Sequence, residues 1–530
     1  MKGRGLVSDF AMALLALSLF SLMLFCTGDD IGITVDEPIY TGIALHLRDW
    51  FSLLLFDPSL ALSKGMLDAA WWTKDMHPPL VKVLSALSMA LFEGVAPPLS
   101  SARGGSMALF ALLFFGLYIS GRMTLGPLCG WLCALSLLSL PRLFGHAHLA
   151  ATDLPATATS FLVALSVFWW SRSPRLRRVP LVAVAFSLAL LSKASTALPG
   201  VASLLWAVAN PRGRRRSWQV LFGAVCWLGL FLLLWPAMWH DTMKRLGEFL
   251  SFHWRHFPVA VWYFGRSYVV APWHYPFVML LFTTPLPVLV CSGFGLYALK
   301  RYPKEAREFL SLCLLCLGAT ILPFALPNTP KYNGVRLFLP ALPFLAAISG
   351  HGAATLSKAL SSALPGGERR LGPMAVTLGL LLGVSSTVRV HPFELSYYGA
   401  LCGGLKGAER LGLEPTYWAD TFLYIVPELN RICPEGALVL VTPPGNESLL
   451  RFYKRAGALR PDIRLSGDEK HDLGRADFLT FQCTPSQYGR LQRWLVRNEA
   501  PVAAVEHDGV RLCVVYSWDS IERALISMGW

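Results

Sequence analysis

Charged residues are scarce in this sequence. Asp, Glu, Lys and Arg make up 15% of its 530 residues, whereas hydrophobic residues make up 54%. No soluble protein of this length needs so much apolar surface. The composition therefore indicates a polytopic α-helical membrane protein.

Acidic residues are the scarcer of the two charge types, with 33 Asp and Glu against 47 Lys and Arg. The resulting net charge of +14 is compatible with nucleic-acid binding. However, the sequence has no basic and aromatic surface of the usual kind, so we predict no nucleic-acid partner. The basic residues instead gather between apolar runs, as cytoplasmic loops do under the positive-inside rule. These basic clusters are 172–178, 212–216, 300–307 and 358–370.

Cysteines are few and metal-binding motifs are nearly absent. There are 11 cysteines and no HExxH motif, and the one C-x-x-C pair, Cys313 and Cys316, lies in an apolar run where packing explains it. Four cysteines lie near the C-terminus and could form one or two disulfides in an oxidising compartment, although the sequence does not give their pairing. These four are Cys402, Cys433, Cys483 and Cys513.

Long apolar runs are what the sequence has in abundance. We predict about eleven transmembrane helices, at about 7–27, 104–121, 124–141, 154–171, 179–193, 197–210, 217–237, 277–299, 307–326, 335–350 and 372–388. The first run has no A-x-A cleavage site and is interpreted as a retained helix rather than a signal peptide. With a cytoplasmic N-terminus, alternation places every basic cluster inside. The run 80–92 is too short to cross and is expected to lie at the membrane interface.

After residue 390 the sequence becomes a mixture of polar and apolar residues. Strands are predicted at 436–441 and 476–483, followed by a hairpin over 501–518 that turns at Asp508-Gly509. Helices are predicted at 446–457 and 485–498. Residues 391–530 are therefore expected to form a small extracytoplasmic α/β domain that follows a membrane domain over 1–390.

The informative polar residues collect on the predicted outer face, largely in the first outer loop, 29–103. Each has an ordinary structural explanation: Asp153 could cap the helix that follows it, and Lys193 could snorkel to the interface. Together they predict one pocket at headgroup depth. The candidate residues are Asp36, Glu37, Asp75, His77, Lys82, Asp153, Lys193 and Arg336.

A carboxylate beside cations at a membrane surface suits a lipid-linked phosphosugar. The phosphate needs cationic partners that stabilise it as the glycosidic bond breaks. The incoming hydroxyl needs one general base, which a single carboxylate can supply.

The order of short motifs is specific. Asp36 and Glu37 follow the first apolar run, "HPPLVK" spans 77–82, "TDLP" spans 152–155, and "KYNGVRLFLPALPFL" spans 331–345. Over 1–390 this order resembles the polyprenyl-phosphate-sugar-dependent glycosyltransferases of the membrane-embedded C-type fold. Within that fold it resembles family 39, which includes the protein O-mannosyltransferases and the lipid A aminoarabinose transferases. The segment 391–422 resembles the stretch after the last span in bacterial members.

The resemblance implies a role for most of the candidate residues. Asp36 would be the general base or the residue that positions the acceptor hydroxyl, and Glu37 would be its partner in the pair. His77 would shape the site, Lys82 would approach the donor or lipid, and Asp153 would organise the pocket. The donor phosphate would bind Lys193 and Arg336, while the role of Asp75 stays open.

Two further expectations concern metals and relatives. Some C-type enzymes use an Asp-x-Asp pair with a divalent ion, but Asp36 and Glu37 are contiguous, so we predict no cofactor, with a divalent metal as the open alternative. Residues 238–276, about 40 in number, leave no room for the inserted domain of the eukaryotic protein mannosyltransferases.

The sequence thus predicts sugar transfer, with inversion, on the outer face of a bacterial inner membrane. The donor would be a polyprenyl-phosphate sugar among the membrane lipids, and the acceptor a hydroxyl of a glycan, lipid or protein. A transporter or flippase is the main alternative, although it would need polar residues near the membrane midplane. A non-catalytic cell-envelope assembly protein is the other.

Overall fold

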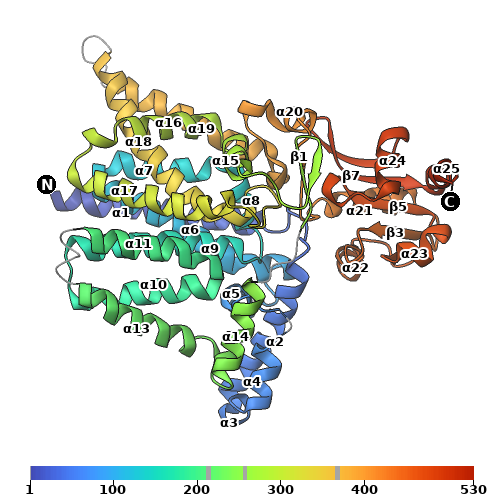
Figure 1. Ribbon diagram of the computed structural model, residues 1–530, viewed down its shortest axis with the longest axis horizontal. Coiled ribbons are helices and arrows are strands. Elements are labelled where there is room, and N and C mark those ends of the chain that lie inside the picture. Colours follow the sequence, from blue (N-terminus) through green and yellow to red (C-terminus); the bar gives the residue numbers. More distant parts are fainter. Residues whose placement is uncertain (1, 74, 211–216, 255–258, 364–369, 530) are drawn as a thin grey trace.

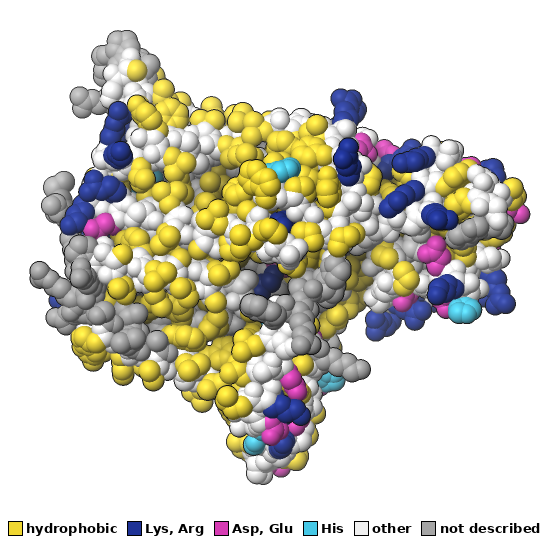
Figure 2. Space-filling model, in the orientation of Figure 1, with side chains coloured by type: hydrophobic (Ala, Val, Ile, Leu, Met, Phe, Trp, Pro, Cys, Tyr) yellow, Lys and Arg dark blue, Asp and Glu magenta, His cyan; other side chains and the backbone are white. Residues whose placement is uncertain are grey.

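The computed structural model describes residues 2–73, 75–210, 217–254, 259–363 and 370–529. A large helical bundle forms one part of the molecule, and a smaller sheet covered by helices extends from one end of it (Figure 1). Apolar side chains cover the visible side of the bundle, and many Lys and Arg side chains lie towards the two ends of the molecule (Figure 2). This distribution is typical of a multi-pass membrane protein.

All eleven predicted apolar runs fall on helices of the bundle. Its main helices are α1 (Lys2–Cys26), α6 (Pro98–Leu125), α7 (Pro127–Leu138), α9 (Asp153–Arg172), α10 (Val179–Ser192), α11 (Ala197–Ala209), α13 (Ser217–Leu233), α15 (Tyr275–Phe282), α16 (Leu286–Tyr297), α17 (Lys304–Ile321), α18 (Leu342–Ala363) and α19 (Leu371–Val390).

The predicted count of eleven crossings is not confirmed. Within the described ranges, five helices are long and apolar enough to cross a membrane, or seven if two bent pairs each count as one. The bent pairs are α7 with α8 (Pro141–Ala147), at 78°, and α15 with α16, at 116°. Helices such as α10 and α11, with 14 and 13 residues, are shorter than the roughly 20 residues that a vertical crossing requires.

The segment 29–103, which the sequence predicts to be the first outer loop, is largely helical. It contains α2 (Glu37–Phe56), α3 (Pro58–Ala61), α4 (Lys64–Trp71) and α5 (Leu80–Phe92). Helix α5 has the predicted bounds, because the double proline before it prevents an earlier start. It packs between α2 and α6. Helix α14 (Thr242–Trp254) projects with α2, α3 and α4 from the same side of the bundle (Figure 1).

The C-terminal sheet has five strands in the order β4-β3-β5-β7-β6. Strand β3 pairs in parallel with both β4 and β5, whereas β7 is antiparallel to β5 and β6. The strand bounds are β3 (Leu438–Thr442), β4 (Arg464–Ser466), β5 (Phe478–Gln482), β6 (Ala503–His507) and β7 (Val510–Ser517). The turn at Asp508-Gly509 has positive φ at both residues, 49° and 73°, as a type I′ hairpin requires.

Most of the C-terminal elements lie where the sequence pattern predicts them. Helices α22 (Glu447–Arg455) and α24 (Arg490–Asn498) occupy the two predicted helical segments. The pattern did not reveal β4, the helix α21 (Phe422–Ile432) or the helix α25 (Trp518–Met528). The four C-terminal cysteines are buried and form no disulfide, so the disulfides considered from sequence are not present.

Candidate functional site

A cavity of about 440 Å³ lies where the bundle meets the sheet. Four of the predicted site residues line it: Asp36, His77, Lys193 and Arg336. The other lining residues are Val35, Thr152, Ser195, Phe252, His253, Val259, Phe324, Pro330, Tyr332, Asn333, Leu337, Trp418, Ala419, Asn446, Gln482 and Gln487. Predicted residues from four separate segments of the chain therefore meet at one place.

Two carboxylates and two cations form a continuous chain beside this cavity. Arg336 donates from one terminal nitrogen to Asp36 Oδ2 at 2.5 Å and from Nε to Asp153 Oδ2 at 3.0 Å. The other oxygen of Asp153 accepts from Lys193 Nζ at 2.7 Å. Asp153 thus holds both cations in place, and charge-assisted bonds of this kind are about twice as strong as neutral ones.

The four groups differ in their access to the cavity. The Asp153 side chain is 1% exposed, whereas that of Asp36 is 26% exposed. Lys193 and Arg336 are 15% and 11% exposed. A substrate in the cavity would therefore meet one carboxylate and two cations, while Asp153 is buried and contacts the substrate only through the two cations that it holds.

Helix ends place these side chains. Asp36 is the N-cap of α2, and Lys193 is the C-cap of α10. Arg336 begins the 3₁₀ segment η6 (Arg336–Ala341), which leads into α18. Asp153 is the first residue of α9, whose N-cap is Thr152, so Asp153 is not the cap that the sequence suggested. Its carboxylate is instead used for the ion pairs.

Trp418 closes the site from the C-terminal part of the chain. The Arg336 guanidinium lies 3.8 Å from the centre of the Trp418 ring, which is a close cation–π contact. Trp418 and Ala419 both have positive φ, 75° and 64°. Gln482, at the end of β5, fixes this turn by accepting a hydrogen bond from the Ala419 backbone N–H at 2.7 Å.

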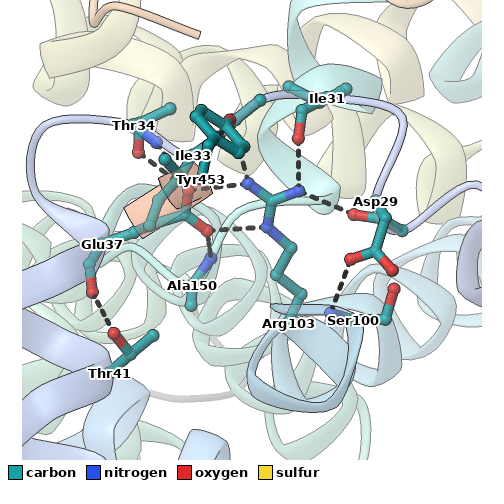
Figure 3. Close-up of polar contacts among 12 residues, drawn as sticks. Asp29, Ile31, Ile33, Thr34, Glu37, Thr41, Ser100, Arg103, Ala150 and Tyr453 are labelled. Atoms are coloured by element: carbon teal, nitrogen blue, oxygen red, sulfur yellow. Dashed lines mark hydrogen bonds and ion pairs between the residues drawn. The ribbon is translucent and has the colours of Figure 1, made fainter. Parts of the chain in front are cut away.

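Glu37 is turned away from the cavity. It forms a two-point ion pair with Arg103 of α6, at 2.8 Å and 2.7 Å, and both side chains are fully buried (Figure 3). Glu37 also accepts from the backbone of Thr34 and Ala150, and Arg103 donates to the carbonyl of Ile31. This pair ties the loop before α2 to α6 and to the loop before α9.

Asp75 and Lys82 form a second buried pair, at 2.5 Å. Lys82 Nζ also donates to the His77 backbone carbonyl at 2.7 Å, so the pair fixes the turn through the double proline. Neither charged group lines the cavity, but the His77 ring does. Burial lowers the pKa of His77 to about 4, so this ring is neutral at pH 7.

The residues available to hold a metal lie elsewhere. Among the described residues, one group of His, Cys and acidic side chains is close enough to bind an ion: Cys129, Cys133 and His351. These residues are buried in α7 and α18, and none lines the cavity. In the cavity, the charged neighbour of Asp36 is the cation Arg336, which competes with any metal.

Several cavity residues were not singled out from the sequence. Tyr332 and Asn333 lie within the quoted motif 331–345, so they could have been found there. Asn446, Gln482 and Gln487 gave no such signal, because only the fold brings the C-terminal sheet to the cavity.

Comparisons with known proteins find similarity both in sequence and in fold. In sequence, the family described as dolichyl-phosphate-mannose-protein mannosyltransferase matches residues 76–239. In structure, the chain is similar to ArnT from Cupriavidus metallidurans in the apo state, with 15% identity and a TM-score of 0.54, covering 98% of this chain and 99% of that one. The resemblance inferred from the motifs is confirmed.

ArnT from the same organism has also been solved bound to undecaprenyl phosphate. This chain matches that structure with 16% identity and a TM-score of 0.54, covering 95% of this chain and 97% of the other. No curated protein matches the sequence.

Proposed function

We propose that this protein is a membrane glycosyltransferase that moves a sugar from a polyprenyl-phosphate-linked donor to an acceptor hydroxyl at the extracytoplasmic face of a bacterial inner membrane. The observation that supports this most directly is the cavity with one accessible carboxylate, Asp36, beside two cations, Lys193 and Arg336. The similarity of fold to ArnT bound to undecaprenyl phosphate supports the class of donor.

In the proposed reaction, Asp36 takes the proton of the acceptor hydroxyl. The acceptor oxygen forms a bond to the anomeric carbon of the donor sugar, and the bond from that carbon to the phosphate oxygen breaks. The electron pair of the broken bond leaves with polyprenyl phosphate, whose charge Lys193 and Arg336 stabilise. Attack from the side opposite the phosphate inverts the anomeric configuration.

The location of the four linked charged side chains fits a donor that is anchored in lipid. Asp153 and Lys193 lie at ends of the bundle helices α9 and α10 rather than at their centres. A phosphate at headgroup depth would meet them there, while its isoprenoid chain remained in the membrane. Apolar cavity residues such as Phe252, Phe324 and Leu337 would contact the first isoprene units.

The substitution Asp36→Asn tests the base. General base catalysis typically contributes about 10²–10⁴-fold, so transfer from labelled undecaprenyl-phosphate sugars should fall at least about 100-fold. Binding of undecaprenyl phosphate should not weaken, because the substitution frees Arg336 from its bond to the carboxylate. The matched control is Asp49→Asn, which changes an exposed carboxylate on α2.

The outcomes separate the proposals. Full transfer by the Asp36→Asn variant would exclude Asp36 as the base. No donor turnover by the wild-type protein with a panel of undecaprenyl-phosphate sugars, together with lipid movement across proteoliposomes, would instead support a flippase. Neither turnover nor transport would favour a non-catalytic assembly role.

A further inference from the structure

The C-terminal sheet meets the cavity at its topological switch point. From β3 the chain passes through α22 to β4 on one side, and then crosses to β5 on the other side of β3. In open α/β sheets, ligands bind outside the carboxyl ends of the strands where the order reverses in this way. Here that place lies between β3 and β5.

The residues at this place line the cavity. Asn446 follows the carboxyl end of β3, Gln482 ends β5, and Gln487 follows it. They form one wall with Trp418 and Ala419, and we call these five residues the sheet wall. The bundle supplies the rest of the charged lining, namely Asp36, Lys193 and Arg336.

The two sides differ in chemistry. Every residue of the sheet wall is uncharged, and three of the five are carboxamides. A carboxamide both donates and accepts hydrogen bonds, which matches a neutral hydroxyl group. A phosphate or carboxylate would find no cation on the sheet wall and would bind the bundle side instead.

Two of the three carboxamide side chains form no hydrogen bond with the described part of the protein. Asn446 is 7% exposed and is the N-cap residue of α22, yet its side chain makes no capping bond and no hydrogen bond to any residue that the structure describes. Gln487 is exposed, and its side chain likewise bonds to none of the described residues. The unpartnered amide of Asn446 is therefore available to a ligand in the cavity.

Gln482 is different, because its side chain is occupied. It accepts from the Ala419 backbone and donates to Asp420 Oδ1 at 3.0 Å. Gln482 therefore positions the turn that carries Trp418, whereas Asn446 and Gln487 are free to bind a ligand.

We propose that the sheet wall is the acceptor subsite, and that the acceptor is a neutral carbohydrate whose hydroxyl groups bond to Asn446 and Gln487. This inference rests on the proposed function. The donor phosphate would occupy the cationic side, and the acceptor would enter from the water-facing sheet. One acceptor hydroxyl would then point across the cavity to Asp36.

The test compares Asn446→Ala, Gln487→Ala and the double variant with a matched control, Asn498→Ala, an exposed amide on α24 away from the cavity. Transfer is measured from the undecaprenyl-phosphate sugar that supports turnover to three probes: neutral glucan and mannan oligosaccharides, a Ser/Thr-rich peptide, and lipid A. Loss of two hydrogen bonds should raise the oligosaccharide KM at least about tenfold in the double variant. The donor KM and donor hydrolysis by water should stay unchanged.

Direct binding separates this inference from the proposed function. Saturation-transfer NMR with the same oligosaccharides should show contact with the wild-type protein in nanodiscs, and a loss of signal in the double variant. Binding without donor turnover would overturn the proposed function and retain the saccharide subsite. The subsite would be overturned if the protein transferred sugar to the peptide or to lipid A and the double variant did not change the KM for that acceptor. It would also be overturned if the double variant raised only the donor KM.

Discussion

Asp36 and Glu37 are adjacent in the chain but differ in what surrounds them. The Asp36 carboxylate opens into the cavity beside Arg336, whereas Glu37 is fully buried against Arg103. Adjacent residues at a helix start point in different directions, so one can face the cavity while the next faces the protein interior. We therefore propose that Asp36 performs the chemistry and that Glu37 holds it in place.

The Glu37→Gln substitution tests this division. It leaves Arg103 as an uncompensated buried charge, and breaking a buried pair in this way costs about 3–5 kcal/mol. We expect a marked fall in the midpoint of thermal unfolding in nanodiscs. The free energy of unfolding of the Asp49→Asn variant should stay within about 0.5 kcal/mol of the wild-type value. Wild-type stability with strongly reduced transfer would indicate that Glu37 takes part in the reaction directly.

At the scale of elements, one histidine joins segments that are far apart in the sequence. His391 follows α19, and its Nδ1 lies 2.6 Å from Glu394 Oε1. Its Nε2 lies 3.1 Å from Asp30 Oδ2, in the loop after α1. The bond to Glu394, followed by the contacts with Asp30, raises the pKa of His391 to about 9.

This arrangement predicts how stability depends on pH. Because the pKa of His391 is higher in the folded protein than its ordinary 6.5, its contribution is fully present below pH 6.5 and is lost as the pH rises through about 9. Glu394, the partner of His391, is fully buried. His148 also faces His391, but burial lowers the pKa of His148, so its ring is neutral in this range.

The measurement is the unfolding midpoint in nanodiscs over the range from pH 6.5 to about 9. The midpoint of the wild-type protein should fall across this range, and that of His391→Gln should fall less. The exposed histidine of α2 supplies the control, His46→Gln, which should follow the wild type. Identical curves for wild type and His391→Gln would contradict the assignment.

At the scale of the whole molecule, the sheet lies beyond one end of the helical bundle (Figure 1). The cavity lies at this junction, so the proposed reaction takes place where lipid-borne and water-borne substrates can meet. The proposed topology places the sheet outside the cytoplasm and the basic loop 300–307 inside.

Accessibility to a membrane-impermeant maleimide tests this orientation. In a Cys26→Ser background, we expect Arg497→Cys, on α24, to be labelled in spheroplasts. Lys300→Cys, in the predicted cytoplasmic loop, should be labelled only after the membrane is permeabilised. Both positions are exposed in the structure. The reverse pattern would invert the proposed topology.

The sequence predicted single elements better than the number of crossings. Helix α5 and the hairpin of β6 and β7 lie where periodicity and turn residues indicated. The crossings were harder to count, because an apolar run does not reveal whether it bends, as α15 and α16 do by 116°. Packing against neighbouring helices determines such bends.

By itself, the sequence determined the membrane class, the apolar runs, one of which ends at Lys193, and the motifs that contain Asp36, His77 and Arg336, because composition, periodicity and short motifs are local properties. Only the tertiary structure decided that Glu37 and the Asp75–Lys82 pair turn away from the cavity, and that Asn446 and Gln487 turn towards it. The direction of a side chain and its partner depend on tertiary contacts, such as those of Glu37 with Arg103 and of Asp36 with Arg336, and no local sequence pattern encodes these contacts.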